Sequence, residues 1–197
     1  IINGETETGV TTFLLNHEID KGGIIGQIRV PILPEDNVGT LYERLMTTGT
    51  SLVTETVDRI AAGEIRPVEQ QHIDEATLRP APKIFKEDCR IDWEKPGREN
   101  VNFVRGLSPY PAAWTEMYRE GDGEASSAKI FSASFEAAVH GEACGTLQSD
   151  GSTFIRVACA DGWIALGELH IAGKTRHAVR ELPPGRRDVQ QCPFREQ

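Results

Sequence analysis

The sequence predicts an α/β segment followed by an all-β segment. This prediction rests on a change along the chain in the spacing of apolar residues and in the residues that separate them. Residues 1–66 hold two apolar, β-branched runs and then a long stretch with apolar residues three or four positions apart, which is the spacing of an amphipathic helix. Beyond Pro111, short apolar runs alternate with Gly, Asp and Ser, as is typical of strands joined by turns. Polar sequence over residues 67–86 separates these segments.

The chain begins with two predicted strands, residues 10–15 and 24–32, joined by a turn. Their β-branched side chains favour extended backbone. Gly22 and Gly23 permit positive φ, so the backbone can turn tightly beside a ligand. The turn also holds Asp20, a carboxylate suited to act as a fixed acid or base. The alternative is that Asp20 only closes the turn through its own backbone hydrogen bonds.

A long helix is predicted after the second strand. Asp36 or Asn37 can cap its amino end, and the helix ends near Gly63. Its apolar positions mostly keep helical spacing, so we expect them to pack on a sheet. These positions are Val38, Leu41, Leu45, Leu52, Val53, Val57 and Ile60.

An extended linker is predicted over residues 67–86, because this stretch is polar, contains prolines and lacks a sustained hydrophobic period. A short helix follows from about Pro96 to Gly106, with the proline near its first turn. We expect this helix to bury Val101, Val104 and Leu107.

Residues 87–197 are predicted to form a small OB-like β-barrel, because short strand-like segments follow one another closely. OB barrels commonly bind nucleic acid, but the fold alone does not establish it. Trp114 and Trp163 lie inside the strand patterns, so core packing is favoured over base stacking. The predicted strands are residues 113–118, 128–135, 145–148, 154–158 and 163–171.

The composition, with 39% hydrophobic and 26% charged residues, is that of an ordinary globular protein. No apolar run approaches the roughly 20 residues that a bilayer requires, so we expect no membrane partner. The cysteines lack the paired spacing of zinc or redox sites, so we expect no metal and reduced thiols in a cytoplasmic protein. These are Cys89, Cys144, Cys159 and Cys192.

The formal net charge of −9 argues against nucleic-acid binding, because phosphate contacts are made by Lys and Arg. However, cations cluster near the carboxyl end with only Glu181 opposing them, and a local basic stripe can bind phosphates on an acidic protein. The alternative is a solvated terminal face. Lys83 and Lys86 form a second candidate in the linker. The terminal cluster consists of Lys174, Arg176, Arg180, Arg186 and Arg187.

Several motifs, in order, resemble one enzyme family. Glu7-Thr8-Gly9-Val10-Thr11, followed by Asp20-x-Gly-x-Ile-Ile-x-Gln, resembles the 10-formyltetrahydrofolate-dependent formyltransferase domain. Ala81-Pro82-Lys83, Arg90-Ile91-Asp92-Trp93 and the stretch 107–115 resemble the linker and second domain of its bacterial methionyl-tRNA members. The resemblance implies that residues 1–66 are the carboxy-terminal part of a Rossmann-like catalytic domain, joined by the linker to the OB-like domain.

The resemblance also implies the chemistry. In this family an amine attacks the formyl carbon of the folate, which requires oxyanion donors and a proton relay. Asp20 is then the catalytic carboxylate, which orients and charge-stabilises a histidine. The backbone of His17, Glu18 and Ile19 then lines the pterin side of the folate pocket. His17 follows the Glu-Thr-Gly motif and so is not the family's catalytic histidine; from the sequence alone it is a polar edge residue.

We therefore expect transfer of a formyl group from 10-formyltetrahydrofolate to the amino group of initiator methionyl-tRNA, by a monomer. The family's Asn-x-His motif belongs upstream of Ile1, so we expect this chain to be an incomplete part of the enzyme and inactive alone. Two alternatives stay open: a formyltransferase acting on an amino sugar nucleotide or related amine, and a module that only binds RNA.

One stretch departs from the family. Where the family has a helix near its end, this chain has Leu182-Pro183-Pro184-Gly185. Paired prolines cannot lie inside a helix, so a helix that begins near Thr175 must end by Leu182. The arrangement of the terminal cations therefore stays open.

Overall fold

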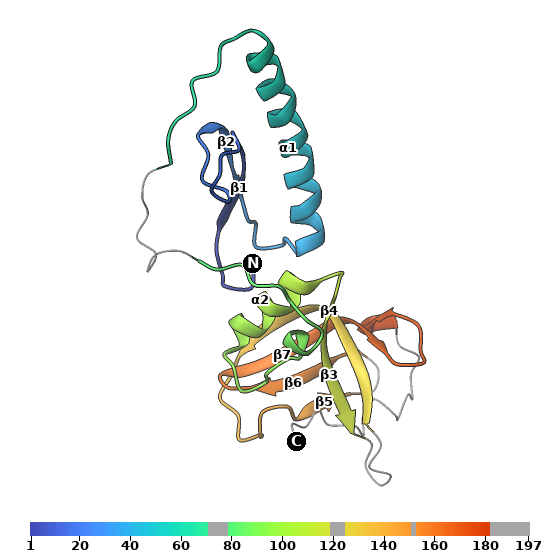
Figure 1. Ribbon diagram of the computed structural model, residues 1–197. Coiled ribbons are helices and arrows are strands. Elements are labelled where there is room, and N and C mark those ends of the chain that lie inside the picture. Colours follow the sequence, from blue (N-terminus) through green and yellow to red (C-terminus); the bar gives the residue numbers. More distant parts are fainter. Residues whose placement is uncertain (71–78, 119–124, 151–152, 182–197) are drawn as a thin grey trace. The chain divides into compact units, whose positions relative to one another are not determined.

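The computed structural model describes residues 1–70, 79–118, 125–150 and 153–181 (Figure 1). The chain divides into two compact units. The first to be described spans Glu5–Lys83, and the second combines Ile1–Gly4 with Ile84–Gln197.

The Glu5–Lys83 unit is a two-stranded antiparallel sheet beside one long helix (Figure 1). Strands β1 (Glu7–Phe13) and β2 (Ile24–Pro31) pair from Glu7–Pro31 to Phe13–Ile24, with an irregularity between Thr12 and Phe13. Helix α1 (Val38–Ala61) lies alongside both strands. The predicted order of two strands and a helix is confirmed in this unit.

The amino end of α1 is capped by Asn37, one of the two predicted caps. The Asn37 side chain accepts a hydrogen bond from the Thr40 N–H at 3.0 Å, and the Thr40 hydroxyl accepts one from the Asn37 N–H at 3.1 Å. This reciprocal pair satisfies two donors that a helix start leaves open. At the other end Gly63 adopts φ +70°, which a glycine reaches without strain.

Helix α1 contacts the sheet through only part of its apolar surface. Leu41, Leu52 and Thr56 are buried, and the Thr56 hydroxyl lies 2.9 Å from that of Thr12 on β1. The expected packing of the helix on a sheet is confirmed, but a second group of apolar side chains lies about a quarter-turn round the helix from the buried ones and is exposed. That exposed stripe comprises Tyr42, Met46, Val53, Val57 and Ile60, each at least 47% exposed.

The first residues after α1 return to the sheet. Val68 and Ile24 exchange two backbone hydrogen bonds of 2.8 Å. This isolated antiparallel bridge places the start of the predicted linker beside β2.

The second unit has a helix packed on a β-sheet. Its strand order is β3-β4-β7-β6-β5, with β8 also paired to β7. Among the described residues β5 does not pair with β3, so the predicted barrel is not closed and the unit is a β domain with a helix. Its elements are η2 (Glu87–Cys89), α2 (Gly97–Leu107), β3 (Ala113–Tyr118), β4 (Ala125–Ala137), β5 (Leu147–Ser149), β6 (Ile155–Cys159), β7 (Gly162–Ile171), β8 (His177–Ala178) and η3 (Val179–Glu181).

Helix α2 closes the core of this unit. Val104 and Leu107 are each 1% exposed and belong to the cluster formed with the strands, against which Val101 also packs. Gly97 lies against the ring of Phe135, where an added Cβ would come within 1.9 Å of the ring. The predicted short helix is confirmed, and its first residue must be small.

The helix predicted from Thr175 is wrong. His177 and Ala178 instead form β8, which pairs with Leu169 and Glu168 of β7, and a single 3-10 turn follows. Pairing with the edge of β7 therefore prevails over the helical pattern in this short segment.

The tryptophans of the predicted strands do not expose their rings fully for base stacking. Trp163 is 6% exposed, and the Arg156 guanidinium covers its ring at 4.4 Å. Trp114 is partly buried, and its indole N–H donates to the Lys86 carbonyl at 2.7 Å. The core role predicted for both residues is thereby supported.

Candidate active site

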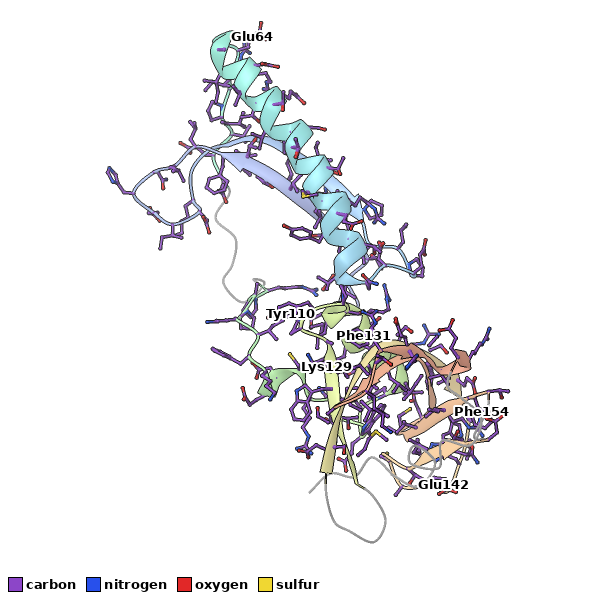
Figure 2. The ribbon with its side chains drawn as sticks, turned by 90° about the vertical axis from the view of Figure 1, so that its right-hand side faces the viewer. Glu64, Tyr110, Lys129, Phe131, Glu142 and Phe154 are labelled. Atoms are coloured by element: carbon purple, nitrogen blue, oxygen red, sulfur yellow. The ribbon has the colours of Figure 1, made fainter. Side chains whose placement is uncertain are left out.

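The loop between β1 and β2, residues 14–23, carries the predicted catalytic residue. Figure 2 shows this loop extending away from α1. The Leu14 N–H donates to the Gly23 carbonyl at 2.9 Å, and a Cβ on Gly22 would lie 1.4 Å from the Leu14 carbonyl oxygen. Only glycine therefore fits at position 22, through close approach of backbone. The positive φ that the two glycines permit is not used at either position; in this loop that conformation belongs to Asp20, at φ 56°.

Asp20 does not close the loop with its own side chain. Asn16 does so: its Oδ1 accepts from the Glu18 N–H at 2.9 Å, and its Nδ2 donates to the Lys21 carbonyl at 3.4 Å. The Asp20 side chain is exposed, and within the described residues its carboxylate makes no hydrogen bond or ion pair. The left-handed conformation is one that Asp tolerates better than most residues. The loop therefore presents a free carboxylate.

The residues predicted to line a folate pocket, His17, Glu18 and Ile19, lie in the same loop. All three are exposed, Ile19 at 88%. Glu18 forms an ion pair of 2.8 Å with Lys21, and the hydrogen bond from Lys21 lowers the pKa of the Glu18 carboxyl. The structure thus places these residues next to Asp20.

The Glu18 N–H is already engaged by Asn16. Among the described residues, the N–H groups of His17 and Ile19 have no such partner. Main-chain donors available to a ligand in this segment are therefore those of His17 and Ile19.

A buried carboxylate lies beyond β2, at the end of the hairpin opposite the Asp20 loop. Asp36 is 2% exposed and receives two hydrogen bonds from Arg44, at 2.7 and 2.6 Å. It also accepts from the Leu33 N–H at 2.7 Å. The Arg44 hydrogen bonds hold the pKa of Asp36 well below its usual range. This network fixes the start of α1 to the end of β2.

The predicted phosphate-binding cations are not all equivalent. Arg176 donates two hydrogen bonds to Glu168, at 2.6 and 2.8 Å, and its guanidinium lies 3.8 Å from the centroid of the Phe131 ring on β4 (Figure 2). These hydrogen bonds raise the pKa of Arg176 and lower that of Glu168. The charge of Arg176 is therefore largely balanced by Glu168.

Arg180, in the turn after β8, is exposed, and Lys174 is partly buried. Lys83 and Lys86 are both exposed but belong to different units. Arg186 and Arg187 lie outside the described residues. Of the terminal cations, Lys174, Arg176 and Arg180 lie in the described part of the chain, within seven residues of one another in sequence.

Sequence reasoning missed two residues that hold the Asp20 loop by side-chain hydrogen bonds: Asn16, within the loop, and Gln70, outside it. The Gln70 side-chain amide donates to the carbonyls of Asp20 and Gly22, at 2.8 and 2.9 Å. Asn16 could have been found as the Asx residue at the loop start. No local signal marks Gln70, because its contact depends on the pairing of Val68 with β2.

The described part of the second unit also has a cavity of about 340 Å³. Its charged lining is mixed, with Arg90, Lys95, Asp92 and Glu99, and it contains none of the predicted site residues. No group of three or more His, Cys, Asp or Glu suited to a metal occurs in the described ranges. No helix among the same residues is long and apolar enough to cross a membrane.

Two family descriptions match the chain. "Formyl transferase" matches residues 1–57, and "Formyl transferase, C-terminal domain" matches residues 83–187. Among curated proteins, the methionyl-tRNA formyltransferase of Bacteroides fragilis is 48% identical over 94% of the chain, and that of Phocaeicola vulgatus is 49% identical over 95%. The chain spans 57% and 58% of the length of these relatives.

Among solved structures, HypX from Aquifex aeolicus in complex with tetrahydrofolic acid superimposes with a TM-score of 0.59 at 20% identity. The match covers 90% of this chain and 30% of that one. At this identity the likeness concerns the fold.

Proposed function

Because the chain belongs to the formyl transferase family, with matches over both its catalytic and its carboxy-terminal domains, we propose that this protein transfers a formyl group from 10-formyltetrahydrofolate to the amino group of initiator methionyl-tRNA. The observation that carries this proposal is the Asp20 turn. Asp20 lies in the family's motif, on a loop whose backbone is held by Asn16. Its own carboxylate does not take part in closing that loop, and its φ of 56° sets it apart from its neighbours. The names of the curated relatives support the substrate.

Asp20 provides the acid–base part of the reaction. An amine that attacks a formyl carbon must lose a proton, and a nearby carboxylate can take or relay it. A carboxylate also stabilises a neighbouring imidazolium, which matches the role that the family resemblance gives to this aspartate. The exposure of Asp20 leaves it accessible to a bound amine.

The same loop would hold the pterin end of the folate, which supplies the formyl carbon. A pterin edge is recognised well by main-chain donors and acceptors. The N–H groups of His17 and Ile19 fit that role, whereas the Glu18 N–H is committed to Asn16. We therefore assign folate contacts to the backbone at residues 17–19, with the Glu18 side chain held aside by Lys21.

The tRNA would be bound by cations of the linker and the carboxy-terminal part. Phosphate contacts by Lys and Arg supply most non-specific affinity for nucleic acid. Arg176, already paired with Glu168, would contribute by holding the segment rather than by a free charge. The proposed contacts are Lys83, Lys86, Lys174, Arg180, Arg186 and Arg187.

The proposed organisation assigns residues 1–66 to the carboxy-terminal part of the catalytic domain and residues 67–86 to a linker. It assigns residues 87–197 to the OB-like domain. The strand order β3-β4-β7-β6-β5, antiparallel throughout, supports an all-β second domain.

A substrate comparison tests this function. The full-length protein is supplied with 10-formyltetrahydrofolate and either methionyl-tRNA or an amino sugar nucleotide, and formylated product is measured. We expect formylated product when methionyl-tRNA is the acceptor and none when the amino sugar nucleotide is the acceptor. Turnover with the sugar nucleotide alone would move the protein to the amino-sugar class. Binding of tRNA without formylation of either substrate would leave an RNA-binding module.

A further inference from the structure

The Asp20 loop is held at its tip by a residue from outside it. The base of the loop is closed by the Leu14–Gly23 hydrogen bond of 2.9 Å, but Asp20 is the seventh of the ten loop residues and lies outside that closure. The part of a loop that lies beyond its closing hydrogen bond is free to move unless other groups bind its backbone. The direction of the Asp20 side chain therefore depends on contacts made near residue 20.

Gln70 supplies those contacts. Its Nε2 donates one hydrogen bond to the Asp20 carbonyl at 2.8 Å and another to the Gly22 carbonyl at 2.9 Å. A side-chain amide has two N–H donors, and both are used here. The carbonyls on either side of Lys21 are thereby drawn to one nitrogen.

Gln70 is itself placed by the sheet. Two residues earlier, Val68 exchanges backbone hydrogen bonds of 2.8 Å with Ile24 at the start of β2. Since Ile24 directly follows Gly23, the same strand end anchors both the loop and the residue that clamps it.

We infer that Gln70 is a positioning residue, which holds the Asp20 carboxylate in its reactive direction by binding the carbonyls of Asp20 and Gly22. The inference rests on the proposed catalytic role of Asp20. Fixing the carbonyl of Asp20 while its φ is 56° fixes the peptide planes beside its Cα, and hence the direction of its Cβ. Misplacing a catalytic group by a small distance costs rate more than binding.

The test is Gln70→Glu in the full-length protein. Glutamate has nearly the same shape but offers oxygen acceptors to two carbonyl oxygens, so both hydrogen bonds are lost. We expect kcat for formyl transfer to fall about tenfold, with KM for methionyl-tRNA unchanged. Gln27→Glu is the matched control, because Gln27 lies on β2 and donates to Thr11 at 3.1 Å, away from the loop; we expect wild-type kcat.

A double variant separates positioning from general damage. If Gln70 acts through Asp20, then Gln70→Glu should cost almost nothing further in an Asp20→Asn background. Full additivity, or a rise in KM with kcat preserved, would overturn the inference. If Asp20→Asn itself keeps wild-type turnover, the proposed catalytic role of Asp20 fails instead. If the wild-type protein transfers no formyl group, the proposed function fails, so these failures are distinguishable from failure of the inference.

Discussion

Replacing Asp36 by Ala should lower the stability of α1 by more than the loss of an exposed ion pair in the same unit does. The Asp36 side chain is 2% exposed, whereas the Arg44 side chain is 33% exposed. The carboxylate accepts two hydrogen bonds from Arg44 and one from the Leu33 N–H. It also accepts one from the Thr40 hydroxyl at 3.0 Å, so its removal deprives four donors of this acceptor at the point where α1 begins.

The magnitude follows from these exposures. A hydrogen bond to a charged group contributes about 1.5–3 kcal/mol, whereas an exposed ion pair contributes about 0–1 kcal/mol. The released Arg44 guanidinium can be rehydrated in part, but the Leu33 N–H loses a buried acceptor. We therefore expect Asp36→Ala to cost about 3 kcal/mol of α1 stability, and Asp36→Asn about 1–2 kcal/mol because one oxygen acceptor remains.

Hydrogen–deuterium exchange of the α1 amides measures this loss directly. A cost of about 3 kcal/mol corresponds to exchange on the order of 10²-fold faster. The control is Glu7→Ala, which removes the ion pair between Glu7 and Arg29, whose side chains are 54% and 77% exposed. We expect less than about 0.5 kcal/mol from it. Exchange in Asp36→Ala no faster than in this control would refute the reasoning.

The same network gives a pH dependence of known sign. The pKa of folded Asp36 is lowered, chiefly by the Arg44 hydrogen bonds, so its stabilisation is complete above the unfolded carboxyl pKa of about 3.9 and is lost as pH falls toward the folded pKa. The exchange difference between wild type and Asp36→Asn should hold from about pH 7 to 5 and shrink below about pH 4. A difference that stays constant down to about pH 2 would contradict this assignment.

Two further outcomes test the second unit. Gly97→Ala should lower its stability by about 1–3 kcal/mol, because the new Cβ would lie 1.9 Å from the Phe135 ring; an unchanged thermal midpoint by tryptophan fluorescence would contradict the packing. Arg180→Ala should weaken tRNA binding and reduce its salt slope by about 1. Arg176→Ala should leave the slope nearly unchanged, since its guanidinium is paired with Glu168; equal slopes for both variants would contradict this.

The regular elements could be predicted because their signals are local. Helix α1 has apolar side chains at helical spacing and a capping Asn37, and its predicted range agrees closely with Val38–Ala61. Strand β3 was predicted at its observed bounds, residues 113–118. In both cases the residues that favour the conformation lie inside the element itself.

The features that were missed depend on contacts distant in sequence. The polar start of β1, at Glu7, becomes a strand only because Pro31 lies opposite it. The positive φ belongs to Asp20 rather than to a glycine, because the glycines are needed for close backbone approach. Gln70 lies 50 positions from Asp20, so no window of sequence contains both.

The most direct test of the account is formyl transfer from 10-formyltetrahydrofolate to methionyl-tRNA by the full-length protein and its Asp20→Asn variant. Asparagine tolerates the left-handed conformation as aspartate does, so the substitution removes the charge and leaves the turn intact. We expect turnover to fall on the order of 10²-fold or more, with tRNA affinity nearly unchanged. Wild-type turnover in Asp20→Asn would remove this carboxylate from the mechanism and contradict the account.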